Sequence, residues 1–274
     1  MSTQTRSAID VVVAGGGSNV VSLGAALFEV ARRRTVARVA GTSAGGLAAL
    51  GLAFGVDETR FKAQLEGSLN GNRLLDGDIV NMMRRFGWCR GDALRKVART
   101  LVGEGKRLGD ASVPVAVVVC DLYERRPRVL SSWGTPNVLV EDAAVATSAI
   151  PGVFAAQEIR GLDVGNRLHV DGGVAVNFAY DLFDDDARPT VGLRPALGPV
   201  VAEPVRGMRA YVLALGGLFM WASQNAHQSR KASGVVVDVP AENGLDFNLA
   251  PADVRRRWTA GLDAARSANL PGGL

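Results

Sequence analysis

The amino-acid sequence predicts an α/β protein in which buried strands alternate with helices. The runs Ile9–Ala14 and Val113–Cys120 have the length and the β-branched content of buried strands, and residues at helical spacing follow the first run. With 274 residues, 47% of them hydrophobic, the chain is long enough to bury a large core. We therefore expect a short N-terminal tail over residues 1–8 and a single domain over residues 9–270.

The first strand runs directly into Gly15-Gly16-Gly17, and a helix is expected over Asn19–Arg33. Glycines between a strand and a helix allow several backbone N–H groups to converge on an anion. A dinucleotide-binding loop is not favoured, because Val20 stands where that motif requires a third glycine or alanine. The same N–H groups are suited to form an oxyanion hole for a nucleophile on the neighbouring strand.

A second strand begins at Val36, breaks at Gly41-Thr42-Ser43-Ala44-Gly45 and continues as an alanine- and leucine-rich helix. This G-x-S-x-G pattern is that of a nucleophile elbow, in which the serine occupies a strained turn and the glycines let neighbouring backbone approach. The positive end of the helix favours an alkoxide at Ser43. Many glycine-rich turns have no catalytic role, so the elbow pattern by itself does not establish Ser43 as a nucleophile. Other motifs in the chain are needed for that conclusion.

The middle of the chain is expected to be mainly helical over residues 56–110, with turns at residues 69–72 and at Gly87. This region contains a cluster of large apolar residues. Such a cluster most often belongs to the core, and the alternative is that it lines an acyl pocket or forms a lid. Its members are Met82, Met83, Phe86 and Trp88. A strand over residues 129–133 is expected beside Val113–Cys120, and a helix that begins at Ala143 should end at Pro151-Gly152.

A short strand at residues 168–170 leads into Asp171-Gly172-Gly173. An aspartate at a strand end, followed by glycines, can present its carboxylate to a neighbour without obstruction. A triad of Ser43, Asp171 and His227 is formally possible, but His227 lies in a polar stretch typical of a surface. The elbow also comes too early in the chain for an α/β-hydrolase, which places several strands before it.

The C-terminal third carries fewer signals. Four prolines within residues 187–207 predict a long surface loop, a candidate flap over the site. A buried helix or strand is expected over Met208–Trp221, a strand over Gly234–Val239 and a closing helix over Ala252–Ala268. The triplet Arg255–Arg257 is expected on a solvated helix face, with contact to lipid headgroups as the alternative.

Composition narrows the classes of partner. The net charge of +4 comes without long basic runs, so nucleic acid is not an expected partner. The two cysteines, Cys89 and Cys120, lack the spacing and the histidine partners of metal ligands, so no metal site is expected. The N-terminus lacks the apolar region of a secretion signal, and the longest apolar run falls short of the roughly 20 residues that span a bilayer. We expect a cytoplasmic protein, and peripheral contact with a membrane is kept as an alternative. The sequence does not indicate the oligomeric state.

Taken together and in this order, Gly15-Gly16-Gly17, the elbow, the run Ser148–Phe154 and Asp171-Gly172-Gly173 resemble the patatin-like phospholipase family, in its bacterial form, over nearly the whole chain. The resemblance implies a three-layer α/β/α fold with a mostly parallel central sheet. It also implies a catalytic domain that hydrolyses lipid acyl esters, as a phospholipase A or esterase, without metal or organic cofactor. The resemblance implies a Ser-Asp dyad of Ser43 and Asp171, which forms an acyl-serine. It implies that the oxyanion-hole donors are Gly15, Gly16 and Gly17. The supporting glycines that it implies are Gly41, Gly45, Gly172 and Gly173.

The chain departs from the family pattern at two places. Ser18-Asn19-Val20 lacks the basic residue and the last glycine of the family's loop, and one asparagine, Asn177, follows where the family often has two asparagines and a proline. An acyltransferase with the same dyad and a non-catalytic lipid-binding or interaction protein are therefore kept as alternatives. Because a free aspartate titrates at about 3.9, Asp171 is expected to be ionised at neutral pH.

Overall fold

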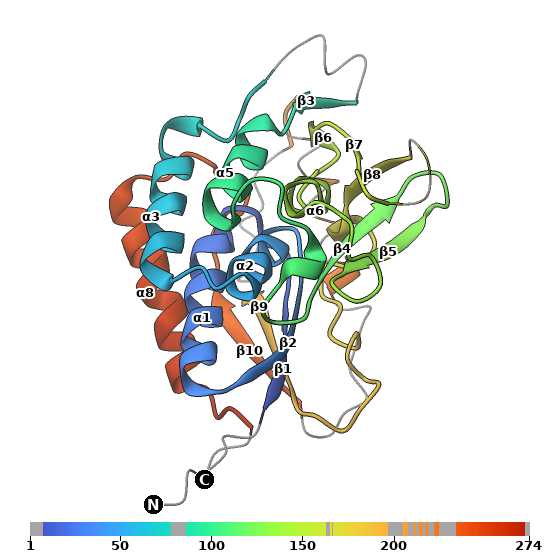
Figure 1. Cartoon of the computed structure of the whole chain (residues 1–274). Coiled ribbons are helices and arrows are strands. Elements are labelled where there is room, and N and C mark those ends of the chain that lie inside the picture. Colours follow the sequence, from blue (N-terminus) through green and yellow to red (C-terminus); the bar gives the residue numbers. More distant parts are fainter. Residues whose placement is uncertain are drawn as a thin grey trace, which may run out of the picture.

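The structure of the chain is a computed structural model, shown in Figure 1. It describes residues 8–77, 86–162, 165, 167–196, 205–207, 211, 214–215, 218, 222–224 and 234–271. The strands are β1 (Ile9–Val13), β2 (Val36–Thr42), β3 (Gly87–Cys89), β4 (Val115–Asp121), β5 (Arg126–Ser131), β6 (Gly152–Phe154), β7 (Gln157–Glu158), β8 (Leu168–Asp171), β9 (Thr190–Ala196) and β10 (Val235–Pro240). The helices are α1 (Val20–Arg33), α2 (Ala44–Ala53), α3 (Glu58–Leu69), α5 (Asp92–Val102), α6 (Val140–Thr147) and α8 (Pro251–Ser267), with 3₁₀ turns η1 (Gly17–Asn19), η2 (Asn70–Asn72), η3 (Leu108–Asp110) and η4 (Gly172–Val174).

The central sheet is mostly parallel, which confirms the predicted fold class. Its strand order is β10-β9-β1-β2-β4-β8-β7, with β5 paired to β4 as well. The five strands from β10 to β4 run parallel, and β5, β7 and β8 add antiparallel pairs at one end. The β1–α1–β2–α2 order places the glycine-rich turn and the elbow at the same, carboxyl edge of two neighbouring parallel strands, where ligands of α/β proteins bind.

One edge of β4 is shared by two strands. The strand β5 pairs with β4 along residues 116–121, so β2 and β8 must both use the opposite edge. On that edge Thr42 pairs with Val118, and Asp171 pairs with the very next residue, Val119. The register of β4 therefore brings the end of β2 and the end of β8 together.

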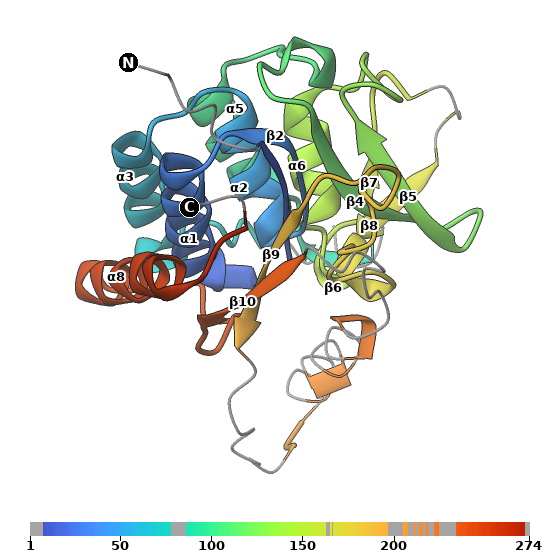
Figure 2. The ribbon, with the colours of Figure 1, turned by 90° about the horizontal axis from the view of Figure 1, so that it is seen from below.

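The helices α1, α2, α3, α5, α6 and α8 form a layer on one face of the sheet, as Figures 1 and 2 show. This face buries the main core, in which alternate residues of β1, such as Val11 and Val13, pack against α1 and α2. The opposite face carries a smaller cluster, where Val12 and Ala14 pack against Phe178, Tyr180 and Phe183. The segment that follows η4 thus covers the second face of the sheet.

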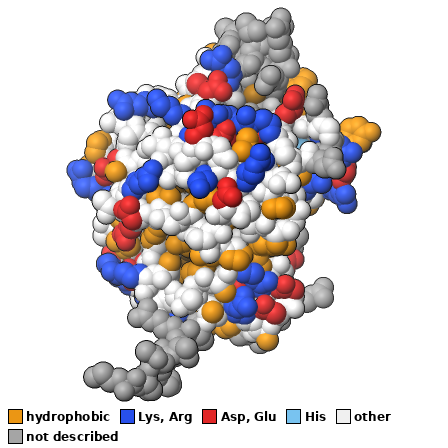
Figure 3. All heavy atoms as spheres, in the orientation of Figure 1, with side chains coloured by type: hydrophobic (Ala, Val, Ile, Leu, Met, Phe, Trp, Pro, Cys, Tyr) orange, Lys and Arg blue, Asp and Glu red, His pale blue; other side chains and the backbone are white. Residues whose placement is uncertain are grey.

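The surface carries charges of both signs. On the face in Figure 3, lysine and arginine side chains lie among aspartate and glutamate side chains over the helical layer. Such interleaving is typical of a solvated helix surface. Within the described residues, no helix has the length and apolar character needed to cross a bilayer.

The strand β9 corrects the prediction of a loop over residues 187–207. Residues 190–196 form a strand between β1 and β10, and its first four residues are buried. The proline signal misled because Pro195 lies beyond Leu193, the last β9 residue that β1 pairs with. Pro195 still pairs with Val239 of β10, and its carbonyl accepts a hydrogen bond from the Gln224 side chain at 3.3 Å.

Three smaller predictions are also corrected. Gly87 begins the strand β3 instead of making a turn, because its backbone packs directly against that of Phe154 in β6. Phe86 and Trp88 are 69% and 43% exposed, so they are not core residues. The side chain of Arg257 is buried, so the Arg255–Arg257 triplet is not wholly solvated.

Two further predicted features fall partly or wholly outside the described residues. Met82 and Met83 lie outside them, as does most of Met208–Trp221. The described residues of the latter segment are helical, and Tyr211 and Leu218 are exposed, contrary to the burial predicted there.

The elbow glycines allow α2 to approach β1 closely. A side-chain carbon at Gly45 would lie 2.3 Å from the Val13 carbonyl oxygen and 2.5 Å from that of Ala14. At Gly41 it would lie 2.2 Å from the Gly45 carbonyl oxygen. These obstacles are backbone atoms, which cannot move aside as a flexible side chain can, so both positions require glycine.

We expect Gly45→Ala to destabilise the protein by more than about 3 kcal/mol, because the added methyl group forces α2 away from β1. The matched control is Gly67→Ala in α3, where the new methyl group would meet no atom within 4 Å. Replacing an exposed helical glycine should stabilise the protein by up to about 1 kcal/mol. Urea unfolding measures both free energies, and equal stability of the two variants would contradict the close approach at the elbow.

Candidate active site

Ser43 occupies the strained turn expected of a nucleophile elbow. Its φ of 53° and ψ of −123° lie outside the regions that non-glycine residues favour, and the residue is 2% exposed. The Ser43 amide donates to the Thr147 hydroxyl oxygen at 2.9 Å, and that hydroxyl donates to the Val118 carbonyl at 2.6 Å. The last residue of α6 therefore ties the turn to β4.

The structure brings the two residues predicted as a dyad into contact. Ser43 Oγ donates to Asp171 Oδ2 at 2.6 Å, and the Gly173 amide donates to Asp171 Oδ1 at 2.7 Å. Gly172 lies against β4, where a side-chain carbon would be 2.4 Å from the Val118 carbonyl oxygen. Gly172 and Gly173 therefore let the chain turn close to β4 with an amide directed at the carboxylate.

The environment of Asp171 changes the expected protonation state. Burial raises the pKa of this carboxyl group to about 7, while the hydrogen bonds from Ser43 and Gly173 oppose the rise. The expectation of a fully ionised aspartate at neutral pH is therefore wrong, because it took the pKa of a solvated group. A carboxylate with a pKa near 7 is a stronger base than a free aspartate and is still substantially ionised at neutral pH.

The glycine-rich loop lies beside the serine. A side-chain carbon at Gly15 would be 3.1 Å from Ser43 Cβ, so the loop passes directly next to the elbow. The Gly15 amide donates to the Asn177 carbonyl at 3.0 Å. Among the described residues, the amides of Gly16 and Gly17 have no acceptor, and Gly17 has a left-handed φ of +58°. These two amides are therefore the loop donors left for an oxyanion.

The two unusual loop residues, Asn19 and Val20, have defined places. The Asn19 side chain donates to the carbonyls of Gly16 and Glu242 and accepts from the Glu242 amide, each at 3.0 Å. Val20 lines the pocket next to Ser43. A basic side chain does reach the loop, because Arg257 of α8 donates to Ser18 Oγ at 3.2 Å. The loop is thus braced from the C-terminal part of the chain.

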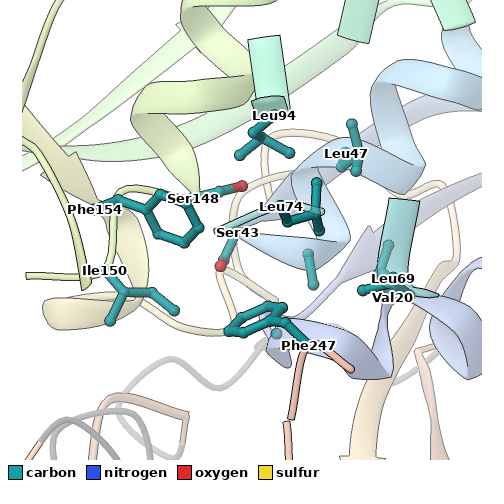
Figure 4. Close-up of a pocket in the computed structure, with 12 residues that line it drawn as sticks. Val20, Ser43, Leu47, Leu69, Leu74, Leu94, Ser148, Ile150, Phe154 and Phe247 are labelled. Carbon is teal, nitrogen blue, oxygen red and sulfur yellow. The ribbon is translucent and has the colours of Figure 1, made fainter. Parts of the chain in front are cut away.

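An apolar pocket opens at Ser43. Figure 4 shows the serine hydroxyl surrounded by aliphatic and aromatic side chains that come from α2, α5, the end of α3 and the segments around β6 and β10. The lining residues are Gly17, Val20, Ser43, Ala44, Leu47, Leu69, Leu74, Leu94, Ser148, Ile150, Phe154 and Phe247. Such a lining suits a hydrocarbon chain and offers few groups that could bind a polar one.

The alternative groups of the sequence analysis lie elsewhere. His227 falls outside the described residues, so the triad alternative gains no support. His169 is buried in β8 opposite Asp121, and burial lowers its pKa. Cys89 and Cys120 are free and buried, and in the described part of the chain no three histidine, cysteine or acidic side chains gather as a metal site would require.

Sequence reasoning missed several residues that support the site. Thr147 immediately precedes the Ser148–Phe154 run, which could have drawn attention to it. Ser223 Oγ donates to the Gly173 carbonyl at 2.7 Å, and the Asn177 side chain donates to Gln224 Oε1 at 3.4 Å. Residues 223 and 224 carry no local motif, so only the fold could reveal them.

Comparisons with known proteins show the family to which the chain belongs. Residues 11–184, which include the glycine-rich loop, the elbow and Asp171–Gly173, match the model of a family described as Patatin-like phospholipase. The uncharacterized protein YqhO of Bacillus subtilis strain 168 is 31% identical over 270 residues, which cover 88% of this chain and 91% of YqhO. A cGAMP-activated phospholipase of Vibrio cholerae serotype O1 is 29% identical over 154 residues, or 51% of this chain and 42% of that protein.

The fold has a counterpart among solved structures. The crystal structure of VipD from Legionella pneumophila superposes with a TM-score of 0.51 and 14% sequence identity, covering 94% of this chain and 66% of the VipD chain. At this identity the likeness concerns the arrangement of helices and strands alone.

The raised pKa of Asp171 predicts that Asp171→Asn stabilises the fold. A carboxyl group with a pKa of about 7 in the folded state and 3.8 otherwise loses stabilising free energy as pH rises between these values, whereas asparagine stays neutral. The increase in the free energy of unfolding caused by Asp171→Asn should approach zero near about pH 4. It should reach at most about 4 kcal/mol near about pH 8, because each unit of pKa shift corresponds to about 1.36 kcal/mol. Thermal unfolding across this range measures it, with the exposed Asp238→Asn as control. A gain independent of pH would contradict the shift.

Proposed function

Because the chain belongs to the patatin-like phospholipase family, we propose that it is a serine lipid acyl hydrolase of the phospholipase A or esterase type. The observation that carries the proposal is the 2.6 Å hydrogen bond from Ser43 Oγ to Asp171 Oδ2, made at the opening of an apolar pocket. A nucleophile, a base and a site for a hydrocarbon chain are then next to one another.

In the first step Ser43 attacks the acyl ester. Asp171 in its carboxylate form accepts the Ser43 proton as Oγ bonds to the carbonyl carbon. The tetrahedral intermediate then breaks the bond to the alcohol, which takes the proton from Asp171 and leaves. The product of this step is an acyl-serine, with the acyl chain against the pocket lining that includes Leu74, Leu94 and Phe154.

The negative charge of the intermediate needs hydrogen-bond donors. The unengaged amides of Gly16 and Gly17 are the donors that we propose, since the loop passes beside Ser43. One such donor contributes about 3 kcal/mol to transition-state stabilisation. The N-terminus of α2, which begins at Ala44, adds a favourable dipole.

In the second step a water molecule releases the fatty acid. Asp171 accepts a proton from the water as its oxygen attacks the acyl carbon, and the proton returns to Ser43 when the ester bond to Oγ breaks. The same acyl-serine could be passed to another alcohol, which is the acyltransferase alternative. The lining formed by the described residues is mostly apolar, with Ser148 supplying the one hydroxyl besides that of Ser43, and hydrolysis is the reaction that we propose.

We also propose that the protein meets lipid surfaces through β3. Trp88 in β3 and Phe86, which immediately precedes the strand, are exposed, and β3 pairs with β6, whose Phe154 lines the pocket. An exposed aromatic pair next to the pocket wall is suited to the interface between headgroups and acyl chains, where amphipathic rings such as that of tryptophan are favoured.

Labelling with a fluorophosphonate tests the nucleophile. The wild type should gain one adduct by intact mass, and Ser43→Ala should gain none and lose at least about 10³-fold in p-nitrophenyl ester turnover. Ser148→Ala, which removes the other serine hydroxyl of the pocket, should keep the adduct. An adduct on Ser43→Ala would assign another nucleophile. A folded wild type that takes no label would favour the non-catalytic lipid-binding alternative.

Sedimentation with vesicles of phosphatidylglycerol and phosphatidylcholine tests the lipid contact. The double variant Phe86→Ser/Trp88→Ser should bind at least about tenfold more weakly, because burial of each ring contributes about 1.5 to 3 kcal/mol. Trp133→Ser is the control, since Trp133 is also exposed but follows β5, away from the pocket. Equal loss in both proteins would show that any exposed aromatic residue suffices.

A further inference from the structure

The side chain of Asn177 has an unusual environment. It is 1% exposed, and its Oδ1 has no hydrogen-bond partner among the described residues. Its Nδ2 faces two acceptors, the Gly15 carbonyl and Gln224 Oε1, each at 3.4 Å. Because only the nitrogen can donate to these oxygens, the amide orientation is fixed and Oδ1 must point the other way. A buried acceptor of this kind needs a donor, and in proteins that donor is commonly a water molecule.

The Asn177 oxygen borders the dyad. A side-chain carbon at Gly173 would lie 2.9 Å from Asn177 Oδ1 and 3.0 Å from Asp171 Oδ1. A side-chain carbon at Gly15 would lie 2.3 Å from Asn177 Oδ1 and 3.1 Å from Ser43 Cβ. The two glycines therefore keep open the space between three groups: the asparagine oxygen, the aspartate oxygen and the serine.

We propose that Asn177 is a further catalytic residue, which binds the water that hydrolyses the acyl-serine. The inference rests on the hydrolase function proposed above. One water O–H donates to Asn177 Oδ1 and the other to the Asp171 carboxylate, which leaves a water lone pair for the acyl carbon. The water oxygen then bonds to the acyl carbon while Asp171 takes the proton that this water had donated to it. Asp171 passes the proton to Ser43 Oγ when the bond between the acyl carbon and Oγ breaks.

A neutral acceptor suits this position. A second carboxylate beside Asp171 would raise the pKa of Asp171 further and keep it protonated at neutral pH. An amide oxygen orients the water without adding charge. The site also gives a role to the Oδ1 atom of the asparagine that follows Asp171-Gly172-Gly173 in the sequence, whose Nδ2 holds the Gly15 carbonyl and Gln224.

The experiment separates acylation from deacylation. We expect Asn177→Leu to take the fluorophosphonate as the wild type does, to release p-nitrophenol in a burst, and then to turn over about 10- to 100-fold more slowly than the wild type, since the water is no longer oriented. Intact mass during turnover should show the acyl-enzyme accumulating. Added methanol should restore acyl release, because an alcohol in excess does not depend on the oriented water.

The matched control is Asn19→Leu. Asn19 is also a buried asparagine that holds a carbonyl of the glycine-rich loop, that of Gly16, but both ends of its amide are paired. Loss of loop support should slow the burst itself, without accumulation of acyl-enzyme. If Asn177→Leu behaves in the same way, Asn177 only supports the loop and the proposal is wrong.

Gly173→Ala provides a second route to the same answer. The new methyl group would lie 2.9 Å from Asn177 Oδ1 and 3.0 Å from Asp171 Oδ1, so it would take the space of the water and push the Asn177 amide aside, and acyl-enzyme should again accumulate. Normal deacylation in folded Asn177→Leu and Gly173→Ala would overturn the water site. A wild type that takes no label at Ser43 would instead refute the proposed hydrolase, so the two failures are distinguishable.

Discussion

The candidate site depends on the register of one strand. Along a single edge of β4, Val118 pairs with the end of β2 and Val119 pairs with Asp171 of β8. The Val118 carbonyl also accepts the Thr147 hydroxyl that holds the Ser43 amide. A slip of one residue in β8 would turn the carboxylate to the other face of the sheet, so the backbone ladder, and not a side-chain contact, sets the distance between serine and aspartate.

Burial of Asp171 links stability with chemistry. The fold holds a carboxyl group in a place where its charged form is disfavoured, and this raises its pKa toward the pH at which a base is most useful. The Gly173 amide and the Ser43 hydroxyl limit that rise. The Asp171 carboxylate and Ser43 also border the space beside Asn177, so the water site that we propose lies in the same solvent-excluded region that shifts the pKa of Asp171.

Local motifs predicted the parts of this site that a few consecutive residues determine. The elbow, the glycine-rich turn and Asp171-Gly172-Gly173 could be read because backbone sterics demand glycine at fixed offsets. The strand β9 was missed, since the effect of Pro195 depends on where its neighbour β1 ends. Thr147, Ser223 and Gln224 were also missed, because their partners are distant in the sequence. The pKa of Asp171 required the burial that only the folded chain provides.

The braces of the glycine-rich loop connect the two ends of the described chain. Ser18 donates its amide to the Gly244 carbonyl, and Asn19 and Arg257 add bonds from the same region. During synthesis, residues 15–19 leave the ribosome long before these partners exist. The loop cannot reach its final shape until residues 242–257 have also emerged, so the nascent chain carries Ser43 without a finished site. A lipid hydrolase built in this way would thereby stay inactive until residues 242–257 have been translated.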